Sequence, residues 1–290
     1  MRRKTRQKSV YIAIKELHEE GYPIIALCEF ANIARSSYYK WLNRTETESD
    51  IENAMILAEI VRVYTEVKGI YGYRRMTMNI NRILNKQYNH KRIYRLMKTA
   101  NMKSVIRKKK KNYRPSTPQI TAENVLNRNF HADIPNQKWL TDVTEFKLTN
   151  GQKAYLSAIL DLNDKSIVSY LLGHSNNNQL VFETFDKAVS ANSDAKPLFH
   201  SDRGFQYTTR QFKSKLDSIM SRVSRCIDNG PMEGFWGIIK SEMYYLQKFN
   251  TYEELKVAID EYINFYNTKR LQKNLKGLTS IEYRNQTLVA

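Results

Sequence analysis

Cysteine is scarce in this chain. Cys28 and Cys226 are the only two cysteines in 290 residues, and they are far apart without a CxxC spacing. The sequence therefore indicates neither a disulfide framework nor a zinc knuckle. We interpret both as ordinary small residues.

Long apolar runs are lacking as well. No stretch reaches eighteen apolar residues, and no apolar segment follows the basic residues 1–6 as it would in a secretory leader. We therefore expect a soluble, intracellular protein without a membrane partner. With 41% apolar residues, the chain can still bury one full core and has room for one or two smaller modules.

Acidic residues are scarce in the first two fifths of the chain. Residues 1–120 hold 26 Lys and Arg against 10 Asp and Glu, whereas residues 121–290 hold 21 against 19. A basic surface of this size typically binds a polyanion, and nucleic acid is favoured because its binding releases counterions. A merely solvated basic surface is the alternative.

A helix-turn-helix unit is predicted near the N-terminus. Residues 8–20 have helical apolar spacing, and two short helices are predicted at residues 24–31 and 35–42. In such a unit the first turn of the second helix faces the DNA groove. Tyr39 and Leu42 are then expected to point inward. The outward, DNA-contacting residues are expected to be Arg35, Ser36, Ser37 and Lys40. A plain helical hairpin is the alternative.

A second helical DNA-binding module is predicted after a polar linker at residues 44–50. Apolar periodicity indicates helices at residues 51–67, 77–84 and 89–98, the last capped by Asn89. The candidate DNA contacts of this module are all basic: Arg74, Arg75, Lys91, Arg92, Arg95 and Lys98.

A basic run follows the second module. Residues 107–111 read Arg-Lys-Lys-Lys-Lys, and prolines at 115 and 118 favour an extended chain. Such a run either follows a phosphate backbone or is a nuclear-import type of patch. Its place between two DNA-binding modules and a catalytic region favours phosphate contacts by Lys108, Lys109 and Lys110.

The apolar pattern changes from helical to extended near residue 138. Strands are predicted at residues 138–148, 154–162, 167–173 and 196–200. Helices are predicted at residues 180–191, 208–216, 232–245 and 252–267. This order is that of an α/β, ribonuclease-H-like fold preceded by all-α modules. The predicted domains are the helix-turn-helix at 1–48, the second module at 49–104, the basic linker at 105–130, and the catalytic core with C-terminal helices at 131–290.

Seven motifs occur in an order that is specific as a set, although each is weak alone. They are Tyr-Gly-Tyr-Arg-Arg at 71–75, Asn-His-Lys-Arg at 89–92, Trp-Leu-Thr-Asp-Val-Thr-Glu-Phe at 139–146, His-Ser-Asp-Arg-Gly-Phe-Gln-Tyr at 200–207, Met-Ser-Arg at 220–222, Asp-Asn-Gly-Pro-Met-Glu-Gly-Phe at 228–235, and Gly-Leu-Thr-Ser-Ile-Glu-Tyr-Arg at 277–284. With them the chain resembles the catalytic subunit of two-frame bacterial insertion sequences, which are transposases of the DDE class related to retroviral integrases.

The resemblance implies that Asp142, Asp202 and Glu233 are the catalytic triad and hold two Mg²⁺ or Mn²⁺ ions. Attack on a phosphodiester needs an activated nucleophile and a neutralised leaving oxygen, which two ions roughly 3.5–4 Å apart provide. Magnesium prefers few carboxylates and several waters, so three acids suffice. Lys240 lies seven residues after Glu233 on the same helix face and is the candidate contact near the scissile phosphate.

Other readings of these residues stay open. Asp161 ends a predicted strand and Asp228 precedes Glu233, and either could face solvent or cap a turn. An acid in a first helical turn, such as Glu233, is favoured by the helix dipole without any catalytic role. Asp142 inside an apolar strand is costly unless it is paired or metal-bound. His200 is either a proton shuttle or outer-shell ligand, or a strand-end histidine with one hydrogen bond.

The segment between Asp202 and Glu233 departs from the family pattern. It is several residues shorter, because residues 215–222 run straight through where the family has a Gly-containing turn and a short strand before the Met-Ser-Arg segment. A missing strand could shift Glu233 by several ångströms, since each extended residue spans about 3.3 Å. This predicts a weakly active or inactive copy.

The resemblance also implies partners. These are double-stranded DNA at the element ends and the target, further copies of the chain on that DNA, and a product of an upstream frame. The zinc-binding His-His-Cys-Cys module of retroviral integrases is absent and the five histidines are scattered, so we expect no zinc. We predict a transposase in the bacterial cytoplasm, at the nucleoid, that cleaves element ends and joins the 3′ hydroxyl to DNA. A DNA-binding regulator with an inactive core and a structure-specific nuclease of the same fold are the alternatives.

Overall fold

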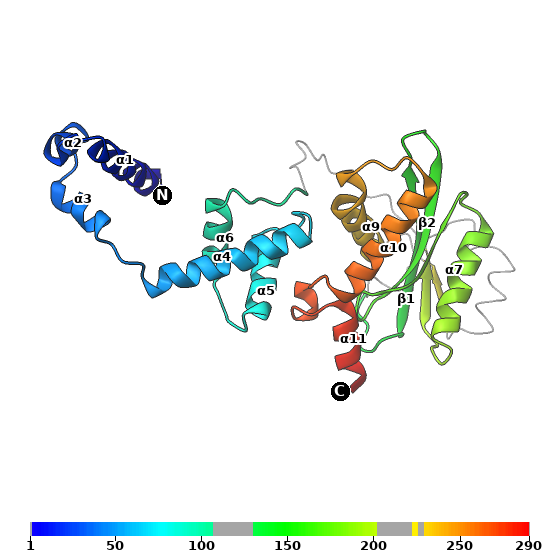
Figure 1. Cartoon of the computed structure of the whole chain (residues 1–290). Coiled ribbons are helices and arrows are strands. Elements are labelled where there is room, and N and C mark those ends of the chain that lie inside the picture. Colours follow the sequence, from blue (N-terminus) through cyan, green and yellow to red (C-terminus); the bar gives the residue numbers. More distant parts are fainter. Residues whose placement is uncertain (1, 107–129, 202–221, 226–228, 290) are drawn as a thin grey trace, which may run out of the picture. The chain divides into compact units, whose positions relative to one another are not determined.

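The computed structural model describes residues 2–106, 130–201, 222–225 and 229–289. The chain folds as two compact units, Met1–Glu59 and Ile60–Ala290 (Figure 1). Helix α4 (Glu48–Glu66) contributes to both units. No helix within the described ranges is long and apolar enough to cross a membrane.

The first unit is built from three helices around a small core. They are α1 (Arg2–Glu19), α2 (Ile24–Phe30) and α3 (Arg35–Leu42), close to the predicted positions. Ile14, Cys28 and Tyr38 are buried together, and the Tyr11 and Trp41 rings stack with centroids 5.5 Å apart. Cys28 therefore serves as a small core residue, as predicted, while Cys226 lies outside the described residues.

The inward face of α3 differs by one residue from the prediction. Tyr39 and Leu42, expected to point inward, are 44% and 41% exposed. Tyr38 is 1% exposed and shares the core with partly buried Trp41. These two residues form the inward pair because they are three positions apart and both lie against the Tyr11 ring.

The polar linker is shorter than predicted because α4 already begins at Glu48. The Thr47 hydroxyl accepts a hydrogen bond from the Asp50 amide at 3.2 Å, and the Asp50 carboxylate accepts one from the Thr47 amide at 3.2 Å. This reciprocal cap satisfies two amide groups at the start of the helix. The Thr-x-x-Asp sequence was the local signal for it.

The second unit opens with the remainder of α4, followed by α5 (Tyr73–Ile83) and α6 (His90–Thr99). Helix α5 begins four residues earlier than predicted, so Arg74 and Arg75 lie in its first turn. Asn89 caps α6 as predicted, since its side chain accepts from the Lys91 amide at 2.8 Å. The buried apolar residues of these helices are Ile60, Val63, Met76, Ile80, Ile93, Leu96 and Met97.

After α6, the described residues of the second unit form a five-stranded sheet of order β3-β2-β1-β4-β5 with helices around it. The strands are β1 (Lys138–Lys147), β2 (Lys153–Asp161), β3 (Ile167–Gly173), β4 (Leu198–Ser201) and β5 (Arg222–Arg225). Neighbours β1, β2 and β3 are antiparallel, whereas β4 runs parallel to both β1 and β5. This is the ribonuclease-H-like arrangement that the sequence predicted.

Helices cover both faces of this sheet (Figure 1). Helix α7 (Asn178–Ala191) packs on one face, and α9 (Gly230–Glu242) and α10 (Tyr252–Thr268) pack on the other. Alternation along β1 sends Trp139 toward α7, and Leu140 and Phe146 toward α9. The short helix Tyr244–Leu246 lies between α9 and α10, and after α10 the chain continues through the short helix Lys273–Leu275 to α11 (Ser280–Val289).

Strand β5 was not among the predicted strands. Arg222–Arg225 pairs in parallel with Leu198–Ser201. It begins at the last residue of the Met-Ser-Arg segment rather than before it. A four-residue strand that pairs with a distant segment leaves little periodic signal in the sequence, so it was missed. The strand expected to be missing precedes the Met-Ser-Arg segment, where residues 202–221 lie outside the described residues, so the displacement of Glu233 stays a prediction. Asp202 and the helix predicted at 208–216 lie outside the described residues.

Candidate active site on strand β1 and helix α9

Asp142 lies in the middle of β1, which is flanked by β2 and β4. Because side chains alternate along a strand, Asp142 shares the face of Leu140 and Phe146, which is covered by α9. The residue is half-buried. The carboxylate therefore sits at the border between the core under α9 and solvent.

Both oxygens of the Asp142 carboxylate accept hydrogen bonds from neutral N–H groups. The Val143 amide donates to Oδ1 at 2.8 Å. The indole Nε1 of Trp236, on α9, donates to Oδ2 at 2.9 Å. Hydrogen bonds to an ionised acceptor are stronger than neutral ones, so the carboxylate is held in a defined orientation against the helix.

Glu233 lies in the first turn of α9 and is exposed. It precedes Trp236 by three residues, which places the two side chains on the same face of the helix. Since Trp236 contacts Asp142, this face of α9 is turned toward the strand carboxylate. The start of the helix is fixed by buried Asn229, whose Nδ2 donates to the Thr141 carbonyl at 2.9 Å.

Lys240 lies further along the same helix, half-buried, with its Nζ 5.4 Å from the centre of the Phe146 ring. Burial lowers the pKa of Lys240, while the charges of Glu145 and Asp142 oppose that shift. Trp236 contacts Asp142 and Lys240 lies over Phe146, so α9 runs alongside β1 and the ammonium group of Lys240 faces this strand.

Only two of the three predicted triad carboxylates belong to the part of the chain that the structure describes. Strand β4 ends at Ser201, which pairs in register with Thr141, and Asp202 directly follows it in the sequence. Within the described residues no three His, Cys, Asp or Glu side chains cluster as metal ligands. The donors that Asp142 and Glu233 offer are carboxylate oxygens, which suit a hard divalent cation such as Mg²⁺.

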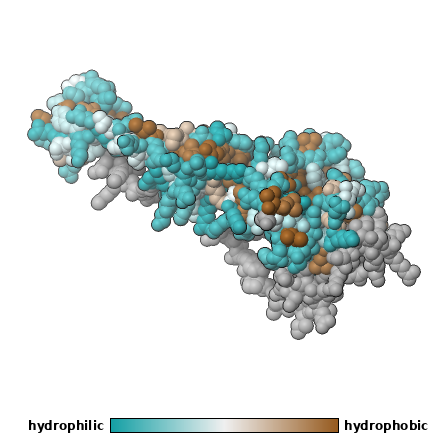
Figure 2. Space-filling model, turned by 90° about the horizontal axis from the view of Figure 1, so that it is seen from below, coloured by the Kyte–Doolittle hydropathy of each residue, from teal (hydrophilic) through white to brown (hydrophobic). Residues whose placement is uncertain are grey.

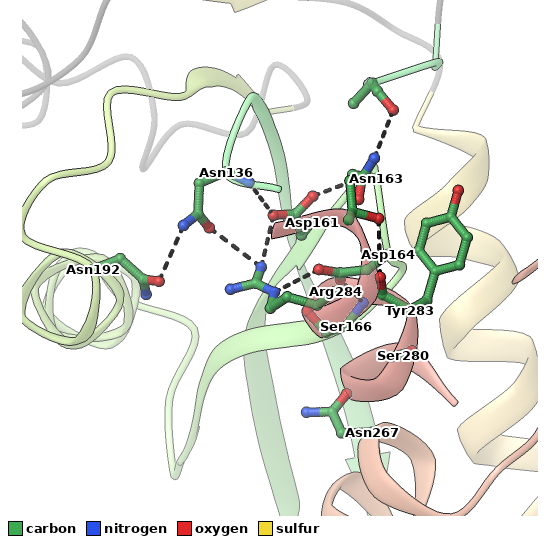
Figure 3. Close-up of polar contacts among 12 residues, drawn as sticks. Asn136, Asp161, Asn163, Asp164, Ser166, Asn192, Asn267, Ser280, Tyr283 and Arg284 are labelled. Atoms are coloured by element: carbon green, nitrogen blue, oxygen red, sulfur yellow. Dashed lines mark hydrogen bonds and ion pairs between the residues drawn. The ribbon is translucent and has the colours of Figure 1, made fainter. Parts of the chain in front are cut away.

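The competing acid Asp161 belongs to a buried network at the turn between β2 and β3 (Figure 3). Asp161 and Asp164 are both 0% exposed. Arg284 of α11 donates from Nη2 to Asp161 at 2.8 Å and from Nε to Asp164 at 2.5 Å. Backbone amides donate to both carboxylates as well. Those of Asn136 and Asn163 donate to Asp161, and that of Ser166 donates to Asp164.

Asp161 was predicted either to face solvent or to cap a turn. It caps a turn, and the prediction of solvent exposure is wrong. Burial, followed by the charge of Asp164, raises its pKa to about 6. Asp228 lies outside the described residues. His200 is buried on β4, in register with Leu140 and Ser224, and its suggested roles stay predictions.

The predicted DNA contacts of the first unit are on its surface. Arg35, Ser36, Ser37 and Lys40 are all exposed on α3. The surface seen in Figure 2 is largely hydrophilic with separate hydrophobic groups. The most exposed large apolar side chain of this unit is Phe30, at 96%.

The predicted DNA contacts of the second unit fall into two classes. Arg74, Lys91, Arg95 and Lys98 are exposed, so their side chains can reach a ligand. Arg92 is half-buried with its guanidinium 5.2 Å from the centre of the Tyr88 ring. Lys108, Lys109 and Lys110 lie outside the described residues.

Arg75 makes an ion pair that the sequence did not reveal. Its Nη1 donates to Glu242 Oε1 at 3.0 Å, and Arg270 donates to both oxygens of the same carboxylate. The side chains of Glu242 and Arg270 are 3% and 5% exposed. Arg75 therefore attaches α5 to the C-terminal end of α9, and no local sequence signal connects these three residues.

Models of known families match three stretches of the chain. Two models described as integrase core domain match residues 132–231 and 233–288, and a model described as HTH-like domain matches residues 50–110. Among solved structures, the HTLV-2 integrase catalytic core domain in complex with magnesium is 24% identical, with a TM-score of 0.44, and the match covers 52% of this chain and 97% of that one.

Two bacterial relatives match most of the chain. "Putative transposase InsK for insertion sequence element IS150" of Escherichia coli K12 is 42% identical over 286 residues, which cover 94% of this chain and 98% of that protein. "Transposase for insertion sequence element IS904" of Lactococcus lactis is 30% identical over 81% of this chain and 95% of that protein. The chain thus belongs to the insertion-sequence transposases with an integrase core domain.

Proposed function

We propose that this transposase is of the DDE type, and that it cleaves element ends and joins the 3′ hydroxyl to DNA by two-metal transesterification. The observation that carries the proposal is the hydrogen bond from Trp236 to Asp142. It brings the acid of β1 to the helix face that also carries Glu233. A divalent-metal site needs carboxylates from separate parts of the chain to lie close together, as a strand acid and a helix acid can here.

Asp142, Asp202 and Glu233 are the carboxylates that would hold two Mg²⁺ or Mn²⁺ ions. Asp202 directly follows Ser201 in the sequence, and Ser201 pairs with Thr141 beside Asp142. The ions would activate the attacking water or 3′ hydroxyl and neutralise the leaving oxygen. Asp142 is held ready for this by its two N–H donors.

The cationic side chains bind the DNA. Lys240 of α9 faces strand β1, which carries Asp142. It would contact the DNA end near the scissile phosphate. The exposed residues of α3, Arg74, and the exposed basic residues of α6 would hold more distant phosphates. Lys108, Lys109 and Lys110 are proposed to follow the backbone between these modules. Element ends and target are double-stranded DNA, on which several copies of the chain assemble, with an upstream-frame product as a further partner.

Strand transfer tests this proposal. Labelled DNA with the genomic ends that flank the open reading frame is mixed with a supercoiled target, Mg²⁺ or Mn²⁺, and the full chain. We expect joined product from the wild type and none from Asp142→Asn or Glu233→Gln. Glu253→Gln is the matched control, because Glu253 is also an exposed acid in the first turn of a helix.

Three results would contradict the proposal. Equal activity of Glu233→Gln and Glu253→Gln would reduce Glu233 to an acid that only stabilises its helix. Cleavage without joining would favour a structure-specific nuclease. Tight binding to the ends without metal-dependent nicking would favour a DNA-binding protein with an inactive core.

A further inference from the structure

We propose that Trp236 is a positioning residue for metal binding: its indole N–H sets the orientation of the Asp142 carboxylate and holds Glu233 beside it. This inference rests on the proposed metal site. It concerns a side chain that the motifs did not single out, and it assigns that side chain a role beyond packing.

The chemistry of the indole limits what Trp236 can do. Its Nε1–H is a donor only, so this nitrogen can hold a carboxylate but offers no lone pair to a metal ion. Trp236 is 6% exposed and belongs to the core under α9, with its ring 5.1 Å from that of Phe235. The donor therefore comes from a rigid, packed side chain, and its 2.9 Å bond to Asp142 Oδ2 has a fixed direction.

A second contact shows why the position of Glu233 depends on this bond. Asn229, 4% exposed, donates to the Thr141 carbonyl, and Trp236 donates to the side chain of the next residue, Asp142. Glu233 lies between these two donors in the sequence. The first turns of α9 are thus tied to consecutive residues of β1 on both sides of Glu233, which fixes the spacing of the two acids.

Partners that orient a metal ligand typically change metal affinity by 10- to 100-fold when they are lost. Trp236→Phe keeps an aromatic ring in the core and removes the N–H. The matched control is Trp139→Phe, because Trp139 is also buried and its Nε1 donates to Asn136 Oδ1 at 3.2 Å instead of to a catalytic acid.

The test is Mn²⁺ binding to the full chain without DNA, followed through the electron paramagnetic resonance of free Mn²⁺. We expect Trp236→Phe to raise the Mn²⁺ dissociation constant by about 10- to 100-fold and to raise the Mg²⁺ concentration needed for half-maximal strand transfer. Trp139→Phe should change the Mn²⁺ dissociation constant and the required Mg²⁺ concentration by no more than about twofold. The thermal unfolding of each variant reports how far the substitution disturbs packing.

The outcomes separate the two levels of the proposal. Unchanged Mn²⁺ affinity in Trp236→Phe, or equal losses in both variants, overturns the positioning role while the metal site stands. Failure of the wild type to bind Mn²⁺, or unchanged binding in Asp142→Asn, overturns the metal site and the positioning role together.

A second measurement does not depend on the folding of Trp236→Phe. The chain has three tryptophans, so Trp41→Phe with Trp139→Phe leaves Trp236 as the single indole. Mn²⁺ bound at Asp142 should quench its fluorescence, and Asp142→Asn should abolish the quenching. Emission that Mn²⁺ leaves unchanged would place the ion away from Trp236 and contradict the inference.

Discussion

Two pairs of acids in the second unit have opposite surroundings. Asp161 and Asp164 are fully buried and share the guanidinium of Arg284 (Figure 3). Asp142 is half-buried and accepts from two neutral N–H groups, while Glu233 is exposed. Acids that share a buried arginine hold the fold together, whereas oriented acids at a solvent border suit a divalent cation.

The largest effect should follow from breaking the buried pair. Arg284→Met leaves two buried carboxylates without their arginine, and we expect a loss of about 3–5 kcal/mol in the free energy of unfolding. Urea unfolding measures it. Arg82→Met is the matched control, since Arg82 also contacts α11, through Glu282, but its side chain is 50% exposed. The exposed Arg82–Glu282 pair should contribute about 1 kcal/mol or less to the free energy of unfolding. Equal losses of unfolding free energy in Arg284→Met and Arg82→Met would contradict the distinction between the buried and the exposed arginine.

The pH dependence of stability sharpens the comparison. Burial raises the pKa of Asp161 to about 6, from an ordinary value of 3.8. The folded state therefore binds this proton more tightly than the unfolded state, so the contribution of Asp161 to stability is full below about pH 4 and falls as pH rises through 6. Relative to Asp161→Asn, the wild type should lose at most about 3 kcal/mol across this window. A difference that grows with pH would contradict the assignment.

A smaller effect is expected at the third buried acid, Glu242. Burial alone would raise its pKa, but the hydrogen bond and charge of Arg270, with the charge of Arg75, lower it. Arg75 is 24% exposed, so Arg75→Met should cost about 1–3 kcal/mol of unfolding free energy. Its exposed neighbour is the control: Arg74→Met should weaken DNA binding and leave stability within about 0.5 kcal/mol. Weaker DNA binding by Arg75→Met at unchanged stability would instead support its predicted DNA contact.

Local patterns made much of the fold predictable. Strand β3 has the predicted bounds, 167–173, and the predicted strand of Asp142 is β1. Apolar alternation and turn residues act over a few neighbours, so a single sequence displays them. The prediction of the inward face of α3 was wrong by one residue. The ring that stacks on Trp41 is Tyr11 of α1, and the sequence of α3 alone does not reveal that contact.

Contacts between distant residues were not predictable. The bond from Trp236 to Asp142 spans 94 positions and that from Arg284 to Asp164 spans 120. Asp161, which Arg284 also neutralises, ends an apolar strand and Asp142 lies inside one, but neither position in the sequence reveals the partner of the carboxylate. The sequence could therefore name the acids, but their partners depend on how strands and helices pack, and those partners decide which acids are structural.

Calorimetric titration of Mn²⁺ into the full-length wild type, Asp142→Asn and Asp161→Asn tests the comparison most directly. Binding should be lost in Asp142→Asn and kept in Asp161→Asn, because only the first removes an acid of the proposed metal site. Loss of binding in Asp161→Asn with full binding in Asp142→Asn would contradict the account, since it would place the metal at the buried turn between β2 and β3.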